Sequence, residues 1–319
     1  YAHHPAPPEP WEPWHCVAVY KVRHIFMGTL HRKLWRGHLL ATAGPDVVAA
    51  MKGDPNQASV IARGNGAHLD LLAGLSPLLN SQSELLKALV DIDGGSNSWA
   101  VHGSRTVKGK PLLAGDPHRG IEFPNVYHQF HMECPEFNAI GLAFPGVPAF
   151  PHFGHNDEVA WCITHGMADD TDVFVETESL EAIQWTSEVV RVRGHQDVEV
   201  FCGSTERGPV VIGDPADGMA LSVAWTGLIG RDTTFEALQP MLAASSCEEL
   251  ENSVRPWVIP VNNLLTADCS GDISFKIRGR VVERPTGNRW TPVPGNAEHA
   301  WSGIEPVPFE QLPGLRKDS

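Results

Sequence analysis

The residues best suited to chemistry lie in one stretch, residues 93–99, which read DGGSNSW. Gly94 and Gly95 allow backbone angles that are closed to other residues, so the Ser96 hydroxyl can approach the carbonyl before it. Attack on that carbonyl would form an ester, and hydrolysis of the ester would leave Ser96 with a free α-amino group. Such an N-terminal residue carries its own base, because the α-amine can take the hydroxyl proton. Taken alone, the stretch also fits a glycine-rich turn that Ser96 or Asn97 caps.

The composition limits the classes of protein to which this chemistry could belong. The chain has 319 residues, of which 42% are hydrophobic and 19% charged, as in globular proteins with a large core. Its net charge of -14 argues against a nucleic-acid-binding surface. No apolar run reaches the roughly 18 residues of a membrane span, and the first residues lack a signal-peptide pattern. Six dispersed cysteines form no CxxC pair and define no disulfide framework.

Elements of two kinds flank this stretch. Before it, apolar residues recur at three- and four-residue steps from 16 to 51, which predicts helix. Residues 67–92 are leucine-rich, and we expect a helix at 84–90 in a spacer that could block a cleft. We interpret the basic residues of the first segment as its solvated outer face. They are Lys21, Arg23, His31, Arg32, Lys33 and Arg36.

After Ser96 the pattern changes to short runs of strand length. Helices are expected only at 234–244 and 247–254 in this part. Many strands with few helices predict a large layered α+β domain. The predicted strands cover residues 97–102, 137–144, 158–163, 173–176, 189–193, 198–202, 209–212, 220–226, 273–277 and 280–283.

A series of ordered motifs follows Gly95. They are GSNSWAVHGSRT (95–106), GKPLLAGDPHR (109–119), FPGVPAFPHFGHNDEVAWCITHG (144–166), DDTDVFVE (169–176), RGPVV (207–211), NNLLTADCSGDI (262–273), RP then TG (284–287), PVPG (292–295) and AWSGIEP (300–306). With them the chain resembles the penicillin acylase family of N-terminal-nucleophile amidohydrolases, especially its cephalosporin-acylase-like branch. The resemblance implies a four-layered αββα sandwich with an N-terminal helical segment.

The resemblance also implies how the chain divides. Residues 1–66 match the end of the small (alpha) subunit, 67–95 the spacer, and 96–319 the start of the large (beta) subunit. The precursor would cut itself between Gly95 and Ser96. The family's small subunit normally begins before Tyr1 and its large subunit continues beyond Ser319, which implies a fragment of the precursor.

Five residues receive catalytic roles from the resemblance. Ser96 matches the nucleophile, and His118 matches a position beside it that helps to orient it. His165 lies where a backbone N–H faces the oxyanion, and Asn263 matches the side-chain donor to the same charge. Arg284 matches an arginine that helps to hold this asparagine and the amine of the nucleophile.

Other assignments stay open. A slip of one residue would put Asn262 in the place of Asn263. Arg119 could bind an acidic acyl chain such as glutaryl, or could be a solvated arginine. Asp169 and Asp172 lie where the family has calcium ligands, and oxygen donors at this spacing suit a hard cation. The resemblance thus implies a structural calcium, with no cofactor needed for the chemistry.

A competing interpretation is a zinc-dependent amide hydrolase, in which an open three-ligand zinc site activates water. The candidate pairs, each three residues apart, are His131 and Cys134, His152 and His155, and Cys162 and His165. None lies in a zinc signature, and strand-like surroundings point successive residues to opposite faces. We therefore place the serine mechanism first.

We expect an amidohydrolase that cleaves a linear amide: acylation of Ser96 expels the amine, and water then releases the acid. Family substrates are β-lactam side chains, of penicillin or cephalosporin type, and N-acyl-homoserine lactones; the sequence does not rank them. The expected partners are a small acyl amide and the two subunits of one precursor. Family members are periplasmic or secreted. A non-catalytic binding fragment is the remaining alternative, and the presence of Ser96, His118 and Asn263 argues against it.

Overall fold

The computed structural model describes residues 10–52, 94–120, 123, 125–176, 180–213, 219–301 and 303–317. The expected helix at 84–90 and the rest of the 67–92 spacer lie outside these residues. The description resumes at Gly94, just before the candidate nucleophile.

Three helices open the described chain, as the sequence predicted for 16–51. They are α1 (Pro13–Met27), α2 (Leu30–Ala43) and α3 (Pro45–Lys52). Pro13 suits the first turn of α1, where a backbone N–H has no helical partner. Gly44 ends α2 at a φ of 87°, a conformation that disfavours residues with a Cβ. No helix among the described residues is long and apolar enough to span a membrane.

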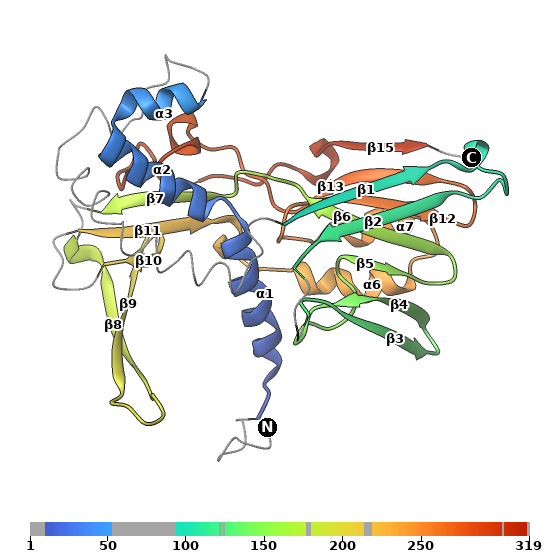
Figure 1. The fold of residues 1–319 in the computed structure, drawn as a ribbon, viewed down its shortest axis with the longest axis horizontal. Coiled ribbons are helices and arrows are strands. Elements are labelled where there is room, and N and C mark those ends of the chain that lie inside the picture. The colour runs from blue at the N-terminus through green and yellow to red at the C-terminus, as the bar shows by residue number, and fades with distance from the viewer. Residues whose placement is uncertain are drawn as a thin grey trace.

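A seven-stranded antiparallel sheet forms the larger body of the protein (Figure 1), in the order β15-β13-β12-β6-β5-β4-β3. Asn263 in β12 pairs with Thr164 in β6, at the end of the sheet nearest Ser96. The strands are β3 (His128–Cys134), β4 (Phe137–Ala143), β5 (Phe153–His155), β6 (Val159–His165), β12 (Asn262–Asp268), β13 (Ile273–Arg278) and β15 (Gly314–Lys317).

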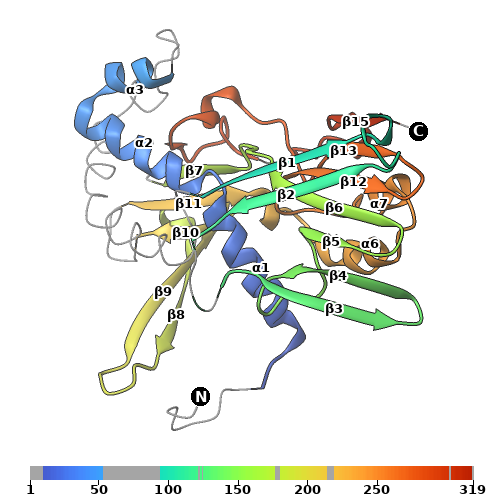
Figure 2. The same cartoon turned by 45° about the vertical axis from the view of Figure 1, so that its right-hand side comes forward.

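Different layers cover the two faces of this sheet. The hairpin of β1 (Gly95–Val101) and β2 (Leu112–His118) lies over one face, where Gly115 packs against Cys162. The other face carries α6 (Leu238–Ala243) and α7 (Cys247–Ser253), as the turned view in Figure 2 shows. The predicted α+β class is confirmed. Helices, sheet and hairpin are three of the four expected layers.

A second sheet has six strands in the order β14-β7-β11-β10-β9-β8. Helix α2 packs on β7, and the β8–β9 pair extends away from the body (Figure 1). Every residue of β7 and β11 is buried. One face of these strands adds Val173 and Val223 to the main hydrophobic core, and the other forms a small separate cluster of Phe174, Ala224 and Val293. Its strands are β7 (Thr171–Glu176), β8 (Gln184–Val190), β9 (Val198–Thr205), β10 (Gly208–Ile212), β11 (Ala220–Trp225) and β14 (Val293–Pro294).

Most predicted strands are confirmed, with two errors. The strand expected at 189–193 ends at Val190 and begins earlier, at Gln184. Residues 280–283 form no strand; Val282 makes only an isolated bridge to Pro306. The strands at 112–118, 128–134, 153–155, 262–268, 293–294 and 314–317 were not predicted. Short 3₁₀ turns complete the structure: η2 (Gly103–Arg105), η3 (Leu180–Ala182), η4 (Thr226–Leu228), η5 (Thr234–Ala237), η6 (Thr286–Arg289) and η7 (Phe309–Gln311).

The sequence predicted that the basic residues of the helical segment form a solvated outer face, but of these residues only Arg32 is exposed. Lys33 is fully buried, and the guanidinium of Arg23 lies 4.2 Å from the ring centre of Phe144. Arg36 stacks in the same way on Trp290, at 3.5 Å. The prediction was wrong because β-strands and loops from later in the chain cover this face of the helices.

The contact between hairpin and sheet yields a stability prediction. A Cβ on Gly115 would lie 2.5 Å from the Cβ of Cys162, so Gly115→Val must separate the layers. Overpacking of this kind typically costs about 1–3 kcal/mol of unfolding free energy. Urea titration should show this loss. Leu112→Val, on the same strand but 62% exposed, is the matched control and should change little. Equal unfolding free energies for both variants would contradict the close contact between Gly115 and Cys162.

Candidate active site

The register of the β1–β2 hairpin places Ser96 beside a histidine. Ser96 is the second residue of β1 and pairs with Pro117, while Gly95 pairs with His118. A Cβ on Gly95 would lie 3.1 Å from His118 Nδ1, so the imidazole packs directly on the glycine of the expected cleavage bond. The other ring nitrogen, Nε2, lies 3.1 Å from Asp116 Oδ2. Successive strand residues point to opposite faces, so His118 shares its face with Gly95, whereas the Ser96 side chain shares the other face with Pro117. The two predicted residues are therefore neighbours along the backbone, with their side chains on different faces of the hairpin.

Ser96 opens onto a cavity of about 280 Å³. One wall is the corner between α1 and α2, residues 26–32, and the opposite wall is the end of β6 with residues 164–168. The start of β1 and Arg119, just beyond β2, form the rest of the lining. Segments from both sides of the expected cleavage bond therefore build one pocket.

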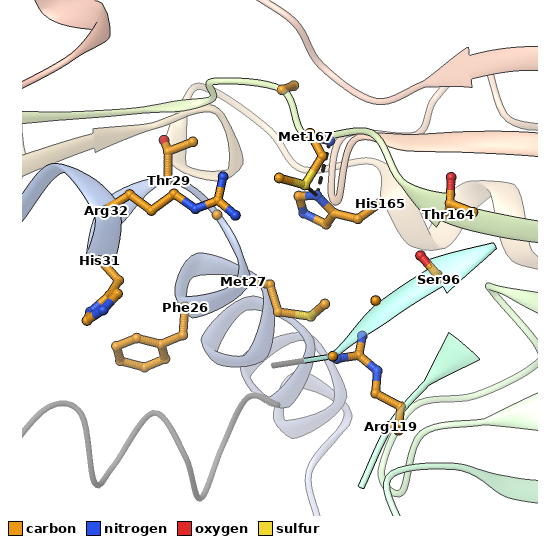
Figure 3. A pocket seen from close by; sticks show the side chains of 14 residues that line it. Phe26, Met27, Thr29, His31, Arg32, Ser96, Arg119, Thr164, His165 and Met167 are labelled. Atoms are coloured by element: carbon orange, nitrogen blue, oxygen red, sulfur yellow. Dashed lines mark hydrogen bonds between the residues drawn. The ribbon is translucent and has the colours of Figure 1, made fainter. Parts of the chain in front are cut away.

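The cavity is positively charged. Arg32 projects into it from α2, and Arg119 lies on the side of Ser96 (Figure 3). No acidic side chain is among the described residues that line it. The Nε atom of Arg119 is buried and lacks a hydrogen-bond partner among the described residues. A cavity with two guanidinium groups and no carboxylate favours an anionic ligand.

His165 supplies a neutral ring to this cavity. Its burial, and then the positive charges of Arg32 and Arg119, lower the pKa of His165 below its ordinary value. The backbone N–H of Met167 donates to His165 Nδ1 at 3.1 Å, which leaves the proton of the neutral ring on Nε2. Met167 holds this position with a φ of 52°, unusual for a residue with a side chain.

A smaller cavity of about 20 Å³, behind Ser96, ends in buried polar groups. Its lining includes Arg23, Tyr127 and Asn262. Burial raises the pKa of Tyr127, and the guanidinium groups of Arg119 and Arg23 oppose that rise. The positive surface thus continues inward from the main cavity.

The two asparagines at the start of β12 point to different faces. Leu265 pairs with Cys162, whose side chain packs on Gly115 of the hairpin. Asn263 lies two residues from Leu265, so it faces the hairpin that carries Ser96. Its Nδ2 donates to Thr164 Oγ1 at 2.8 Å, and Thr164 lines the cavity. Asn263 therefore lies on the hairpin face, whereas Asn262 lines the smaller cavity together with Ser96.

Asn262 belongs to a buried network instead. Its side-chain oxygen accepts from Arg278 Nη2 at 3.2 Å, and Arg278 is fully buried, with its guanidinium 3.5 Å from the ring centre of Trp257. Burial lowers the pKa of Arg278 to about 9. His152, also buried, lies 3.3 Å from the same guanidinium.

Arg284 lies away from its expected place beside Asn263. Its Nε donates to both carboxylate oxygens of Asp172 at 3.0 Å, and its terminal nitrogens bind Asp169. Lys33 pairs with the same two aspartates. The predicted calcium ligands are therefore already neutralised by two cationic side chains, and this arrangement does not fit a calcium site.

The zinc interpretation finds no support in the described part of the chain. No cluster of three or more histidine, cysteine, aspartate or glutamate residues there could hold a metal ion. His131 instead lies 2.7 Å from Asn138 Oδ1, and burial lowers the pKa of His152 well below its usual range.

Sequence reasoning missed the part that the first helices play in this site. Arg32, His31 and Thr29 line the cavity, yet they lie far from Ser96 in the chain. The excess of basic residues between 21 and 36 was the available signal. It did not show which of them turn inward.

The chain is similar in sequence to proteins of known family. The sequence profile of the Penicillin amidase family matches residues 1–318. The chain is 38% identical, over 97% of its length, to the penicillin acylase 2 proenzyme of Pseudomonas sp. (strain SE83). The chain belongs to the penicillin amidase family. The resemblance seen in its motifs is thereby confirmed.

More distant relatives in the family carry two kinds of name. The acyl-homoserine lactone acylase QuiP of Pseudomonas fluorescens (strain Pf0-1) is 27% identical over 76% of the chain, and the penicillin G acylase of Escherichia coli is 25% identical over 68%. The chain spans 42% of the SE83 relative and 32% of this QuiP protein.

A solved structure supports the fold. The thermostable penicillin G acylase of Alcaligenes faecalis superposes with a TM-score of 0.61, at 23% sequence identity. The match covers 69% of this chain and 42% of that one.

The lowered pKa of His165 predicts an acid-sensitive site. Below the ordinary value of 6.5 the unfolded chain binds a proton that the folded site rejects, so stability falls as pH drops through this value. We expect wild type to lose more unfolding free energy than His165→Gln between about pH 7.5 and pH 5.5, by up to about 1.4 kcal/mol per pH unit. Urea titrations at both pH values measure this. Because buried His24 and His152 are common to both proteins, the difference isolates His165; an equal loss would contradict the assignment.

Proposed function

We propose that this chain is part of an acylase that hydrolyses linear amides with Ser96 as its N-terminal nucleophile. The observation that carries the proposal is the position of Ser96: it follows two glycines, is the second residue of a strand and opens onto a cavity. The family supports the reaction class, since its named relatives are penicillin acylases and acyl-homoserine lactone acylases.

Maturation comes first in this proposal. Ser96 Oγ attacks the Gly95 carbonyl, the C–N bond breaks, and the nitrogen takes a proton to become the α-amine. Water then hydrolyses the ester and releases the Gly95 carboxylate. The His118 imidazole packs against Gly95 with its Nε2 on Asp116, on the opposite face of the hairpin from the Ser96 side chain, so in this proposal His118 supports the Gly95 side of the cleaved bond. The proenzyme name of the SE83 relative agrees with such processing.

Turnover uses the same atoms. The free α-amine accepts the Ser96 hydroxyl proton as Oγ attacks the substrate carbonyl, and the proton passes to the departing amine. Water hydrolyses the acyl ester and releases the acid. We assign Asn263 Nδ2 and the backbone N–H of His165 as donors to the negative oxygen, where two aligned donors lower the barrier. The bond from Asn263 to Thr164 holds the amide group on this face in advance.

The charge of the cavity narrows the range of acyl groups that the site would bind. Arg119 and Arg32, with no acidic side chain among the described lining residues, favour an acyl group that ends in a carboxylate. Among the substrates expected from the sequence, this favours a β-lactam with an acidic side chain such as glutaryl. The hydrocarbon acyl chain of a homoserine lactone would offer neither guanidinium group a charged partner.

Maturation gives the first test. The full-length protein should yield a chain that begins Ser-Asn-Ser-Trp, detected by N-terminal sequencing and intact mass. Ser96→Ala should abolish both the cut and the hydrolysis, because no hydroxyl remains to attack. Ser104→Ala, at an exposed turn hydroxyl in the same segment, is the control and should process normally. Active protein in which Ser96 stays inside the chain would refute the proposal.

Substrate charge gives the second test. With Arg119→Gln, kcat/KM for a glutaryl amide should fall about tenfold or more, since one charged contact is worth about 1.5–3 kcal/mol. A neutral acyl amide of similar length should lose much less, because it lacks the carboxylate. Arg231→Gln, an exposed arginine paired with Glu236, controls for net charge. Equal losses for both substrates would remove Arg119 from the acyl site while leaving the nucleophile assignment untouched.

A further inference from the structure

The amino group of Lys33 lies in a cage of oxygen atoms. Its Nζ is 2.6 Å from Asp172 Oδ1, 3.0 Å from Asp169 Oδ1 and 2.8 Å from the backbone oxygen of Asn288. Lys33 and Asp172 are both fully buried. The ammonium group donates hydrogen bonds to Asp172 Oδ1 and to the Asn288 backbone oxygen, and Asp169 Oδ1 adds an ion-pair contact.

The surrounding donors leave Asp172 fully occupied. Besides Lys33, its carboxylate accepts from Arg284 Nε at both oxygens, from Asn288 Nδ2 at 2.8 Å and from Trp301 Nε1 at 2.6 Å. A carboxylate offers about four lone-pair directions, so little capacity remains for a metal ion.

The charges of the cage also balance. Lys33 and Arg284 supply two positive charges, and Asp169 and Asp172 supply two negative ones. A divalent ion added to this group would leave an uncompensated double charge next to a buried ammonium, where repulsion is only weakly screened.

The cage also holds the corner of the helices. Lys33 lies in the first turns of α2, while Asp172 lies in β7, a strand from the other side of the expected cleavage bond. Thr29 Oγ1 donates to Asp169 Oδ1 at 3.0 Å. The cage thus fixes the corner from which Arg32 enters the cavity.

We propose that the Lys33 ammonium is the resident cation of this cage and takes the structural place of a metal ion, so that the protein needs no calcium there. Lys33 is a positioning residue: it joins α2 to β7 and fixes the cavity wall. This inference rests on the cage alone, and its test does not depend on the acylase assignment.

Wild type tests the proposal without any substitution. The full-length protein should contain no stoichiometric calcium by elemental mass spectrometry after dialysis. Its unfolding temperature should be the same in a chelator as in millimolar calcium chloride. Stoichiometric bound calcium whose removal lowers the unfolding temperature would overturn the proposal.

Two substitutions at Lys33 test the cage itself. Lys33→Ala empties it, and Asp169, which is 31% exposed, offers a route in from solvent. Its unfolding temperature should fall by several degrees and be restored in a saturable way by methylammonium or calcium. Lys33→Met fills the same space without a charge, so it should be equally destabilised but not restored. Lys110→Ala, at an exposed lysine whose Nζ donates to the backbone oxygen of Cys269, is the control and should stay close to wild type.

The results expected from these variants distinguish support for the cage from its refutation. Restoration of Lys33→Ala alone supports a cation cage that lysine normally fills. A Lys33→Ala protein as stable as wild type, or one that neither cation restores, would overturn the proposal. Hydrolysis assays on the same samples report the acylase assignment separately, since loss of Ser96 activity leaves the cage intact.

Discussion

The buried pair between Lys33 and Asp172 is the contact on which the site depends. It joins residues 139 positions apart and ties the first helices to the second sheet. Removing one partner of such a pair typically costs about 3–5 kcal/mol, because the other charge stays buried without compensation. The corner of α1 and α2, which forms a wall of the cavity, has its place because this pair holds.

Around that wall, charged and uncharged side chains occupy different parts of the site. Arg32 and Arg119 make the cavity positive, and His165 remains neutral between them because it is buried. On the other side, Asn263 and the strand that carries Ser96 present uncharged donors. A fixed array of this kind can bind a charged acyl end while it stabilises charge that develops at the reacting carbonyl.

The local parts of this site could be predicted from sequence, and the long-range parts could not. The strand after Gly95 and the helices at 16–51 can be predicted from the periodicity of apolar residues and from the glycines that interrupt it. Helical periodicity does not reveal that later parts of the chain cover Lys33 and Arg23, so the pattern alone predicts solvated charge at both positions. Arg284 was placed by motif alone, and no motif records that its guanidinium binds Asp169 and Asp172.

The central claim is that Ser96 carries the acyl group during turnover. Brief incubation of the mature protein with an activated glutarate ester, followed by an acid quench, allows the adduct to be mapped by mass spectrometry. The account predicts a glutaryl mass on the peptide that begins at Ser96. Hydroxylamine should remove it, because an ester on Oγ is labile and an amide on the α-amine is not. A hydrolytically active protein whose only adduct lies on another residue would contradict the account.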